Sequence, residues 1–266
     1  MTEPAQNPLQ LFDLKGKAAV ITGASGAYGR TLAVALGAMG CDLLLAAGSP
    51  DGLKAAAEEA RATGARVETI IRRPDSADDA EAIIDAGYEA FGSVGLLVVA
   101  SGLNRPAMIG DMEPEVWEEV MNANVRGEWL MAKAFGPRLI EAGVPGKMLM
   151  VSSVRGRHGN AAGYTAYCTS KGATDALTRV LATEWGQYGI NVNAIAPTVF
   201  RSALTSWIFA DDEKGKAARA RNLSRLPLGR LGEPEDLVGI SIYLLSPASD
   251  FCTGQVIYVD GGYTAG

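Results

Sequence analysis

The stretch Thr22-Gly23-Ala24-Ser25-Gly26-Ala27-Tyr28-Gly29 joins the apolar run Lys17–Thr22 to the amphipathic run Tyr28–Met39. The first run predicts a buried strand, and the second predicts a helix that ends at Gly40. A glycine turn in this context lets backbone N–H groups approach a pyrophosphate, and the helix N-terminus favours its negative charge. The turn therefore predicts a dinucleotide site formed by Gly23, Ser25, Gly26, Ala27, Tyr28 and Gly29. The alternative is a glycine-rich turn with no ligand.

The rest of the chain repeats this alternation of strand and helix. Further strands are expected at Cys41–Ala47, Arg66–Ile71, Gly95–Ser101, Lys147–Ser152, Ile190–Ile195 and Gln255–Val259. Further helices are expected at Gly52–Thr63, Ala77–Phe91, Glu113–Ala142, Thr165–Tyr188 and Glu233–Leu245. Strands that are apolar throughout are buried on both faces, as in parallel sheets, and strict alternation implies right-handed crossovers. The pattern predicts one α/β domain over residues 1–266: a doubly wound parallel (Rossmann) sheet of about seven strands, with helices on both faces.

One long segment, residues 202–230, lies outside the alternation. Insertions of this length inside a compact domain are often functional, so the segment is expected to be a lid over a substrate. Within it, Asp211–Arg225 has the pattern of an exposed helix, and its arginines are expected to be solvated.

Composition excludes several classes of protein. The 266 residues include 24 Lys and Arg against 30 Asp and Glu, and the net charge of −6 is a poor match for nucleic acid. No apolar run is long enough to cross a membrane, and the N-terminal MTEPAQNPLQLF lacks the features of a signal peptide. The three widely spaced cysteines favour a cytoplasmic protein without disulfides. One histidine and the absence of CxxC spacing predict that the chain has no metal site.

The end of the second strand bears on the choice of cofactor. Nucleotide-binding proteins that use NAD often carry an acid there to bind the ribose hydroxyls, but this chain has Ala46-Ala47-Gly48-Ser49. An acid would repel a 2′-phosphate, so its absence favours NADP(H), with NAD(H) as the alternative. The candidates for contacts with the phosphate are Ser49, or Arg72 and Arg73 after the third strand. The alternative is that the two arginines are merely solvated.

A tyrosine and a lysine stand four residues apart at the start of a long helix. In Tyr167-Cys168-Thr169-Ser170-Lys171 this spacing places Tyr167 and Lys171 on one helical face. A nearby ammonium favours phenolate over phenol, so such a tyrosine can take a proton from an alcohol or give one to a ketone. Ser153 follows the fifth strand, whose carboxyl end faces the site in an open α/β sheet, and its hydroxyl is placed to bond the substrate oxygen.

These residues resemble the short-chain dehydrogenase/reductase family over nearly the whole chain, from about Leu14 to Gly262. Further matches are Asn122-Ala123-Asn124-Val125, Asn191–Pro197, Pro227–Pro234, and Thr253-Gly254-Gln255 leading to Val259–Gly262. The resemblance implies a fourth catalytic residue, Asn124, which interrupts the long helix and helps to hold a water in a proton relay behind Lys171. It also implies that Lys171 binds the nicotinamide ribose.

The chain departs from the family pattern around the cofactor. Its glycine turn has the spacing TGxxGxxG, with Ala27 where the ordinary branch has Gly. The family's Asn-Asn-Ala-Gly aligns with Val99-Ala100-Ser101-Gly102, the Asp that usually meets adenine aligns with Arg73, and Pro-Gly after the sixth strand is Pro197-Thr198. Taken through the resemblance, the cofactor residues beyond the turn are Ser49, Arg73, Ala100, Ser101, Gly102, Tyr167, Lys171, Pro197, Thr198 and Val199.

The resemblance also implies which residues form the substrate pocket. They are Ser153, Arg155, His158, Asn160, Tyr164, Phe200 and Trp207. Arg155 is placed to clamp a carboxylate or hydroxyls, the alternative being a salt bridge at a subunit interface. His158 can equally satisfy a loop, and Trp207 can be lid packing. The mixed wall suggests a polyol, a sugar acid or a hydroxy-ketone.

The sequence therefore predicts an NAD(P)-dependent oxidoreductase that interconverts a secondary alcohol and a ketone. Two alternatives remain: a nucleotide-binding regulator or scaffold that has lost catalysis, suggested by the altered cofactor edges, and an epimerase or dehydratase, suggested by the glycine spacing. By resemblance, a homotetramer or homodimer is expected to pair through Glu113–Ala142 and Thr165–Tyr188, with a second interface at Tyr258–Gly266.

Overall fold

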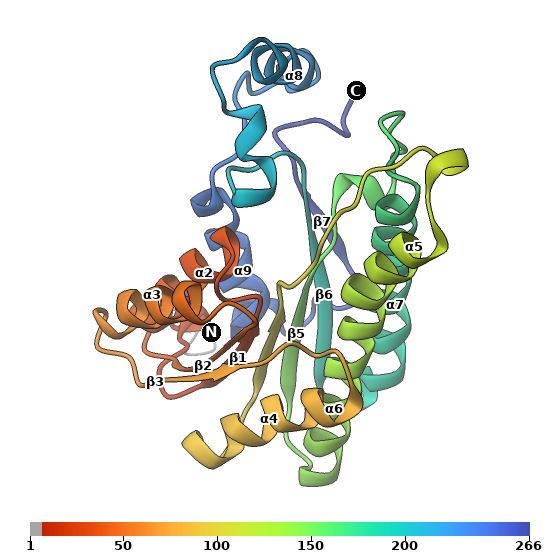
Figure 1. Ribbon diagram of the computed structural model, residues 1–266. Helices are drawn as coiled ribbons and strands as arrows, with labels where there is room; N and C mark the ends of the chain where they lie inside the picture. Colours follow the sequence, from red (N-terminus) through yellow and green to blue (C-terminus); the bar gives the residue numbers. More distant parts are fainter. Residues whose placement is uncertain (1–6) are drawn as a thin grey trace.

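The protein is built around one parallel sheet of seven strands, with helices packed on both of its faces (Figure 1). The computed structural model describes residues 7–266. The strands follow the order β3-β2-β1-β4-β5-β6-β7, and every neighbouring pair is parallel. The order reverses between β1 and β4, which is the crevice where doubly wound sheets bind ligands. The expected Rossmann fold is confirmed.

The elements lie close to where the sequence predicts them. The strands are β1 (Ala18–Thr22), β2 (Asp42–Ala47), β3 (Val67–Ile71), β4 (Leu96–Val99), β5 (Gly146–Val151), β6 (Ile190–Pro197) and β7 (Val256–Val259). The helices are α2 (Ala27–Ala38), α3 (Pro50–Arg61), α4 (Ala77–Phe91), α5 (Pro114–Met121), α6 (Gly127–Ala142), α7 (Thr165–Trp185), α8 (Glu213–Leu223) and α9 (Val238–Leu245). Short 3₁₀ turns lie in several of the connections, among them η4 (Val154–Gly156), η6 (Ala203–Ile208) and η7 (Pro234–Leu237).

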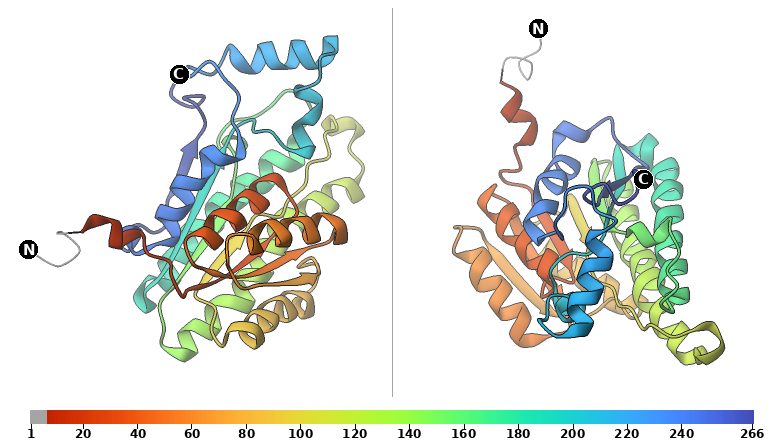
Figure 2. Two further views of the ribbon diagram at one scale, coloured as in Figure 1. Left: turned by 90° about the vertical axis from the view of Figure 1, so that its left-hand side faces the viewer. Right: turned by 90° about the horizontal axis from the view of Figure 1, so that it is seen from above.

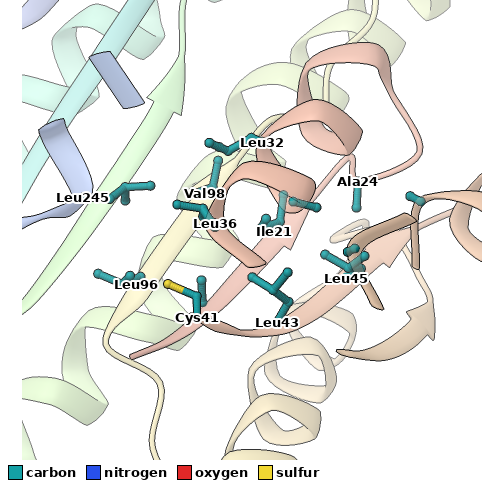
Figure 3. Packing of buried hydrophobic residues seen from close by; sticks show 14 of the residues in the cluster. Ile21, Ala24, Leu32, Leu36, Cys41, Leu43, Leu45, Leu96, Val98 and Leu245 are labelled. Carbon is teal, nitrogen blue, oxygen red and sulfur yellow. The ribbon is translucent and has the colours of Figure 1, made fainter. Parts of the chain in front are cut away.

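Alternate residues of each central strand enter two separate cores. Ile21 of β1 packs with Leu32 and Leu36 of α2 on the face that α2, α3 and α9 cover (Figure 3). Val20, the preceding residue of the same strand, lies on the other face of the sheet, which α4, α6 and α7 cover. Because successive side chains of a strand point to opposite faces, a strand buried on both sides has to be apolar throughout. This explains the unbroken apolar runs in the sequence.

The expected helix Glu113–Ala142 is broken in its middle. Helix α5 ends at Met121, a π-helical turn occupies Asn122–Arg126, and α6 begins at Gly127. A π turn inserts an extra residue into the ladder of hydrogen bonds, and such bulges are frequent at functional sites. Here it carries Asn124, which is fully buried.

The segment that the sequence sets apart lies over the carboxyl ends of the strands. It contains η6 and α8, and α8 stands at the top of Figure 1 above β6 and β7, clear of the two helical layers (Figure 2). A small apolar cluster attaches it to the body of the protein through Ile208, Ala218 and Leu226, which pack with Val154 and Tyr263. The segment is therefore docked on the edge of the sheet where the site is expected.

Part of the N-terminal stretch considered above, residues 1–6, lies outside the described residues. Among residues 7–266, no helix combines the length and apolar character that crossing a membrane requires. The three cysteines are free thiols, Cys41 being buried and Cys168 and Cys252 partly buried.

Candidate active site

One large cleft follows the carboxyl ends of the strands, with a volume of about 1440 Å³. It runs from the glycine turn after β1, past the ends of β4 and β5, to the segment containing η6 and α8. Of the predicted site residues, all except Asn124 and His158 line it. The structure therefore brings the proposed cofactor and substrate residues together in one continuous cavity.

The glycine turn after β1 leaves open space for a ligand. Gly23 has φ +66°, and a Cβ there would lie 2.6 Å from the carbonyl carbon of Ala100. A Cβ at Gly29 would lie 2.5 Å from the Gly23 oxygen. Gly26 is the N-cap of α2 and offers no side chain to its first N–H groups, and the first turn of the helix holds no acid. Uncapped donors at a helix N-terminus suit a phosphate group, so the turn fits a pyrophosphate.

Ser49 and Arg73 meet at the far end of the cleft, beyond β2. Ser49 is the N-cap of α3, and its hydroxyl accepts a hydrogen bond from the Gly52 N–H at 3.3 Å. The Arg73 side chain lies over Gly48, because a Cβ added to that glycine would overlap the guanidinium. Arg72 is paired instead with Asp79, at 2.6 Å. Within residues 7–266 no carboxylate lies within salt-bridge distance of Arg73, which leaves its guanidinium available to an anion at this helix N-terminus.

The loop after β4 is held by its neighbours on both sides. The Ser101 hydroxyl lies 3.3 Å from that of Thr22 at the end of β1. The Asn124 amide donates to the Leu103 carbonyl at 2.9 Å, and its oxygen accepts from the Leu103 N–H at 2.7 Å. The same amide donates to the Ser170 hydroxyl on α7 at 2.9 Å. Asn124 thus ties the floor of the cleft to the helix that carries Tyr167, from a buried position behind the cavity.

Tyr167 and Lys171 lie on the first two turns of α7 and both line the cleft. The Lys171 ammonium donates to the Val151 carbonyl at the end of β5, at 2.7 Å. The Tyr167 ring meets that of Tyr164 edge-on, with 6.1 Å between the centroids. The i,i+4 spacing places phenol and ammonium on one face, as the sequence predicts. This arrangement suits proton transfer at an oxygen bound in the cleft.

Ser153 bridges the ends of two neighbouring strands beside this pair. Its hydroxyl donates to the Pro197 carbonyl at the end of β6, at 3.3 Å, and accepts from the Arg155 N–H at 3.2 Å. The side chain is nearly buried, yet it lines the cleft. The hydroxyl is therefore fixed at the floor of the cavity.

The end of the cleft next to the segment 202–230 holds several basic residues, of which the sequence analysis singled out only Arg155. The guanidinium carbon of Arg225 lies 4.1 Å from the centre of the Tyr263 ring, and that of Arg155 lies 5.5 Å from it. Tyr263 is 3% exposed, and its hydroxyl has no hydrogen-bond partner among the described residues. Arg201, Lys214 and Arg221 also line the cavity. Arg221 is exposed, as expected, but it lines the cleft. Arg219 is half-buried and donates to the Ile208 carbonyl at 3.4 Å, so the expectation that the arginines of this helix are solvated is wrong for Arg219.

His158 is the predicted pocket residue that the structure leaves out of the cleft wall. Its ring packs edge-on against Tyr263, with 6.2 Å between centroids, and it is not among the residues lining the cavity. The other predicted wall residues, Asn160, Tyr164, Phe200 and Trp207, do line it. His158 therefore supports the position of Tyr263 from behind.

The cleft is basic although the chain is acidic. The net charge is −6, but nine of the cleft's lining residues are Lys or Arg and only two, Asp75 and Glu119, are acids. Glu119 is paired with Arg105 at 3.0 Å. No carboxylate lies within salt-bridge distance of Arg155, Lys214, Arg221 or Arg225 in the part of the chain that is described. A cleft with unpaired cations concentrates anionic ligands.

Comparisons with known proteins agree with this site. A family model described as enoyl-(acyl carrier protein) reductase matches residues 23–264. A protein of Mycobacterium tuberculosis named as an uncharacterized oxidoreductase is 52% identical over 97% of this chain and 94% of its own length. Gluconate 5-dehydrogenase of Gluconobacter oxydans is 33% identical over 96% of this chain and 97% of its own. The crystal structure of a gluconate 5-dehydrogenase from Burkholderia cenocepacia, in complex with NADP and tartrate, superposes with a TM-score of 0.90 at 30% identity, covering 98% of this chain and all of that one.

The chain belongs to the short-chain dehydrogenase/reductase family. It is an NAD(P)-dependent oxidoreductase that acts on an alcohol or a ketone, as predicted from the sequence.

Proposed function

We propose that the protein oxidises a secondary hydroxyl of a sugar acid to the ketone, and reduces the ketone in the reverse direction, with NADP(H) as the preferred cofactor. The observation that carries the choice of substrate is the basic end of the cleft, where the guanidinium groups of Arg155 and Arg225 lie over the Tyr263 ring. Two guanidinium groups bind a carboxylate well, because each can donate a pair of charge-assisted hydrogen bonds to it. The gluconate 5-dehydrogenases among the relatives support this choice.

Tyr167 is the general acid/base in this proposal. The cofactor, when bound, supplies or takes up a hydride at its nicotinamide ring. Tyr167 takes the hydroxyl proton of the alcohol, or returns it to the ketone oxygen. The ammonium of Lys171 favours the phenolate form, which lowers the cost of removing that proton at neutral pH. The same lysine would bind the nicotinamide ribose.

Ser153 and Asn124 support this transfer in different ways. The Ser153 hydroxyl, fixed between the ends of β5 and β6, bonds the substrate oxygen and orients it toward Tyr167. Asn124 holds the loop Ala100–Leu103 against α7 through its three hydrogen bonds and orders the proton relay behind Lys171. Positioning of this kind converts a bimolecular reaction into an effectively unimolecular one.

The cofactor would lie along the other half of the cleft. Gly23, Ser25, Gly26, Ala27, Tyr28 and Gly29 would hold its pyrophosphate, and Ala100, Ser101, Gly102, Pro197, Thr198 and Val199 would surround the rest. Preference for NADP rests on Arg73 and Ser49, since an unpaired guanidinium suits a 2′-phosphate and the Ser49 hydroxyl, which accepts from the Gly52 N–H, keeps its own proton to donate. The relative crystallised with NADP is consistent with this preference.

The substrate assignment is tested by comparing an acid with a neutral analogue of the same length. The wild-type protein is expected to oxidise D-gluconate with NADP at a kcat/KM at least tenfold above that for the polyol sorbitol. Arg225→Ala should raise KM for gluconate about tenfold or more and leave KM for any measurable polyol unchanged, because only the acid loses a charged contact. Equal activity on acid and polyol, or equal losses in the variant, would remove the sugar acid from consideration. Cofactor binding without turnover of any carbonyl compound would instead favour a regulator.

We further propose that residues 202–230 act as a lid, within a single domain over residues 1–266. The segment meets the cleft through Trp207, Lys214, Arg221 and Arg225, so its position decides whether the substrate end is open. Closure would exclude water from the reacting atoms.

The protein is proposed to form a homodimer or a homotetramer, in which copies of the chain pair through the outer face of helices α5, α6 and α7. A shallow apolar groove runs there between Met121, Trp129 and Val180, with Trp129 47% and Val180 52% exposed. An exposed apolar patch on paired helices suits the same face of a second copy. Light scattering that finds only a monomer would contradict this assembly.

The free thiols favour the cytoplasm as the location of the protein.

A further inference from the structure

A carboxyl group lies in the interior of the protein directly behind the proposed catalytic lysine. Glu128, on the first turn of α6, is 0% exposed. Its Oε1 is 3.5 Å from the Lys171 Nζ, and its Oε2 accepts a hydrogen bond from the Thr174 hydroxyl at 2.7 Å. Oε1 accepts no hydrogen bond within residues 7–266. A charge without full compensation in such a place is costly, so its presence calls for a function.

The surroundings of Glu128 contain few other charges. Lys171 is the cation that favours its ionised form, and Asp175, also on α7, is the acid that opposes it. Asp175 is itself engaged by the Ser152 hydroxyl. Lys171 is 3% exposed and has two oxygen neighbours, the Val151 carbonyl and Glu128. Among the described residues Glu128 is therefore the one carboxylate paired with this ammonium.

We propose that Glu128 is a positioning residue, which keeps the Lys171 ammonium protonated in its dry site and directs it toward Tyr167. A buried lysine without a counter-charge loses its proton easily, because burial penalises the charged form. A neutral amine would no longer favour the Tyr167 phenolate, and the general base would fail. The inference rests on the proposed function, in which Lys171 acts through its charge.

The ionisation of Glu128 fits this role. Burial raises the pKa of its carboxyl to about 7, while Lys171 and the Thr174 hydroxyl pull it down. The carboxylate is thus formed above neutral pH. The two titrations belong to the pair rather than to either residue.

Glu128→Gln is the decisive variant, because the amide keeps an acceptor for Thr174 and removes both the charge and the acceptor that face the Lys171 ammonium. The kcat/KM for oxidation of gluconate by NADP is measured from pH 6 to 11. In the variant, the alkaline fall in activity should begin at least one pH unit lower than in the wild type, a loss of tenfold or more at pH 10. Glu128→Asp, which keeps the charge, should recover part of the shift. An alkaline limb that coincides in Glu128→Gln and wild type overturns the proposal.

Thr174→Val is the matched control, since it removes the hydroxyl bonded to Glu128 and keeps the charge. Its alkaline limb should coincide with that of the wild type; a shift as large as that of Glu128→Gln would mean that packing causes the effect, and would overturn the proposal.

A second measurement needs no substrate. A double-mutant cycle of Glu128→Gln and Lys171→Met is measured by urea unfolding at pH 5 and at pH 9. The coupling free energy of the two residues should be larger at pH 9, because the Glu128 carboxylate forms between these two pH values. A coupling independent of pH overturns the ion pair. If the wild type turns over no sugar acid, the proposed function fails, and this cycle still decides whether Glu128 holds the lysine.

Discussion

Glu128→Gln should make the stability of the protein less dependent on pH, and the size of the effect follows from the burial of this carboxyl. The pKa of Glu128 is raised from 4.5 to about 7 by burial. The folded state therefore binds more protons than the unfolded state between these values, so the stability falls as pH rises through this window. The neutral glutamine does not titrate. The difference in unfolding free energy, variant minus wild type, should thus increase by about 3 kcal/mol between pH 4 and pH 8.

The assay is thermal or urea unfolding of both proteins at matched concentration between pH 4.5 and 9. A change of about 3 kcal/mol means that the Tm of the variant, relative to that of the wild type, should rise by about 10 °C from the acid to the alkaline end of this range. Glu184→Gln is a suitable control, because this residue lies on α7 in an exposed position and its variant should differ from the wild type equally at all pH values. A Glu128→Gln difference that is the same at pH 4.5 and pH 8.5 would refute the raised pKa and the burial argument behind it.

Two further substitutions test the cofactor half of the cleft. Arg73→Glu should lower kcat/KM for NADP about 100-fold and leave kcat/KM for NAD within about threefold of the wild-type value. The substitution replaces the unpaired guanidinium over Gly48 with a negative charge that repels a 2′-phosphate. Equal effects on both cofactors in steady-state kinetics would contradict the assignment of Arg73 to the 2′-phosphate. Gly23→Ala should abolish detectable NADPH binding in a fluorescence titration, because the new Cβ would lie 2.6 Å from backbone atoms of Ala100 at a positive φ. Gly110→Ala, at an open position, should bind normally, and retention of binding by Gly23→Ala would remove the turn from the site.

Local patterns predicted the sheet and the residues of the glycine turn that line the cleft. Buried strands are apolar on both faces, and Gly23 and Gly29 stand where a side chain would meet backbone, so these features are visible in the sequence itself. The interruption near Asn124 was expected from the family, and its form is a π turn. Each of these features is determined by residues that are close to one another in the sequence, so the sequence alone reveals it.

The residues that pattern reading missed depend on contacts between distant segments. Arg225 and Tyr263 come from the lid and the C-terminus, and only the folded chain stacks them. Glu128 lies in a helix where a charged residue usually faces solvent. Its spacing of four from the buried Asn124, which places both on one helical face, was the signal that could have identified it. His158 was assigned to the pocket by its position in the sequence, and the Tyr263 ring separates it from the cleft wall.

The central claim is that Tyr167 transfers the proton that accompanies hydride transfer between a sugar acid and NADP. The most direct measurement is the initial rate of NADP reduction by D-gluconate in the wild type and in Tyr167→Phe, with NADPH binding checked in both proteins. The phenylalanine keeps the ring and removes the hydroxyl, so the rate should fall by about 100- to 10,000-fold while the cofactor still binds. A variant that reduces NADP at the wild-type rate would contradict the account.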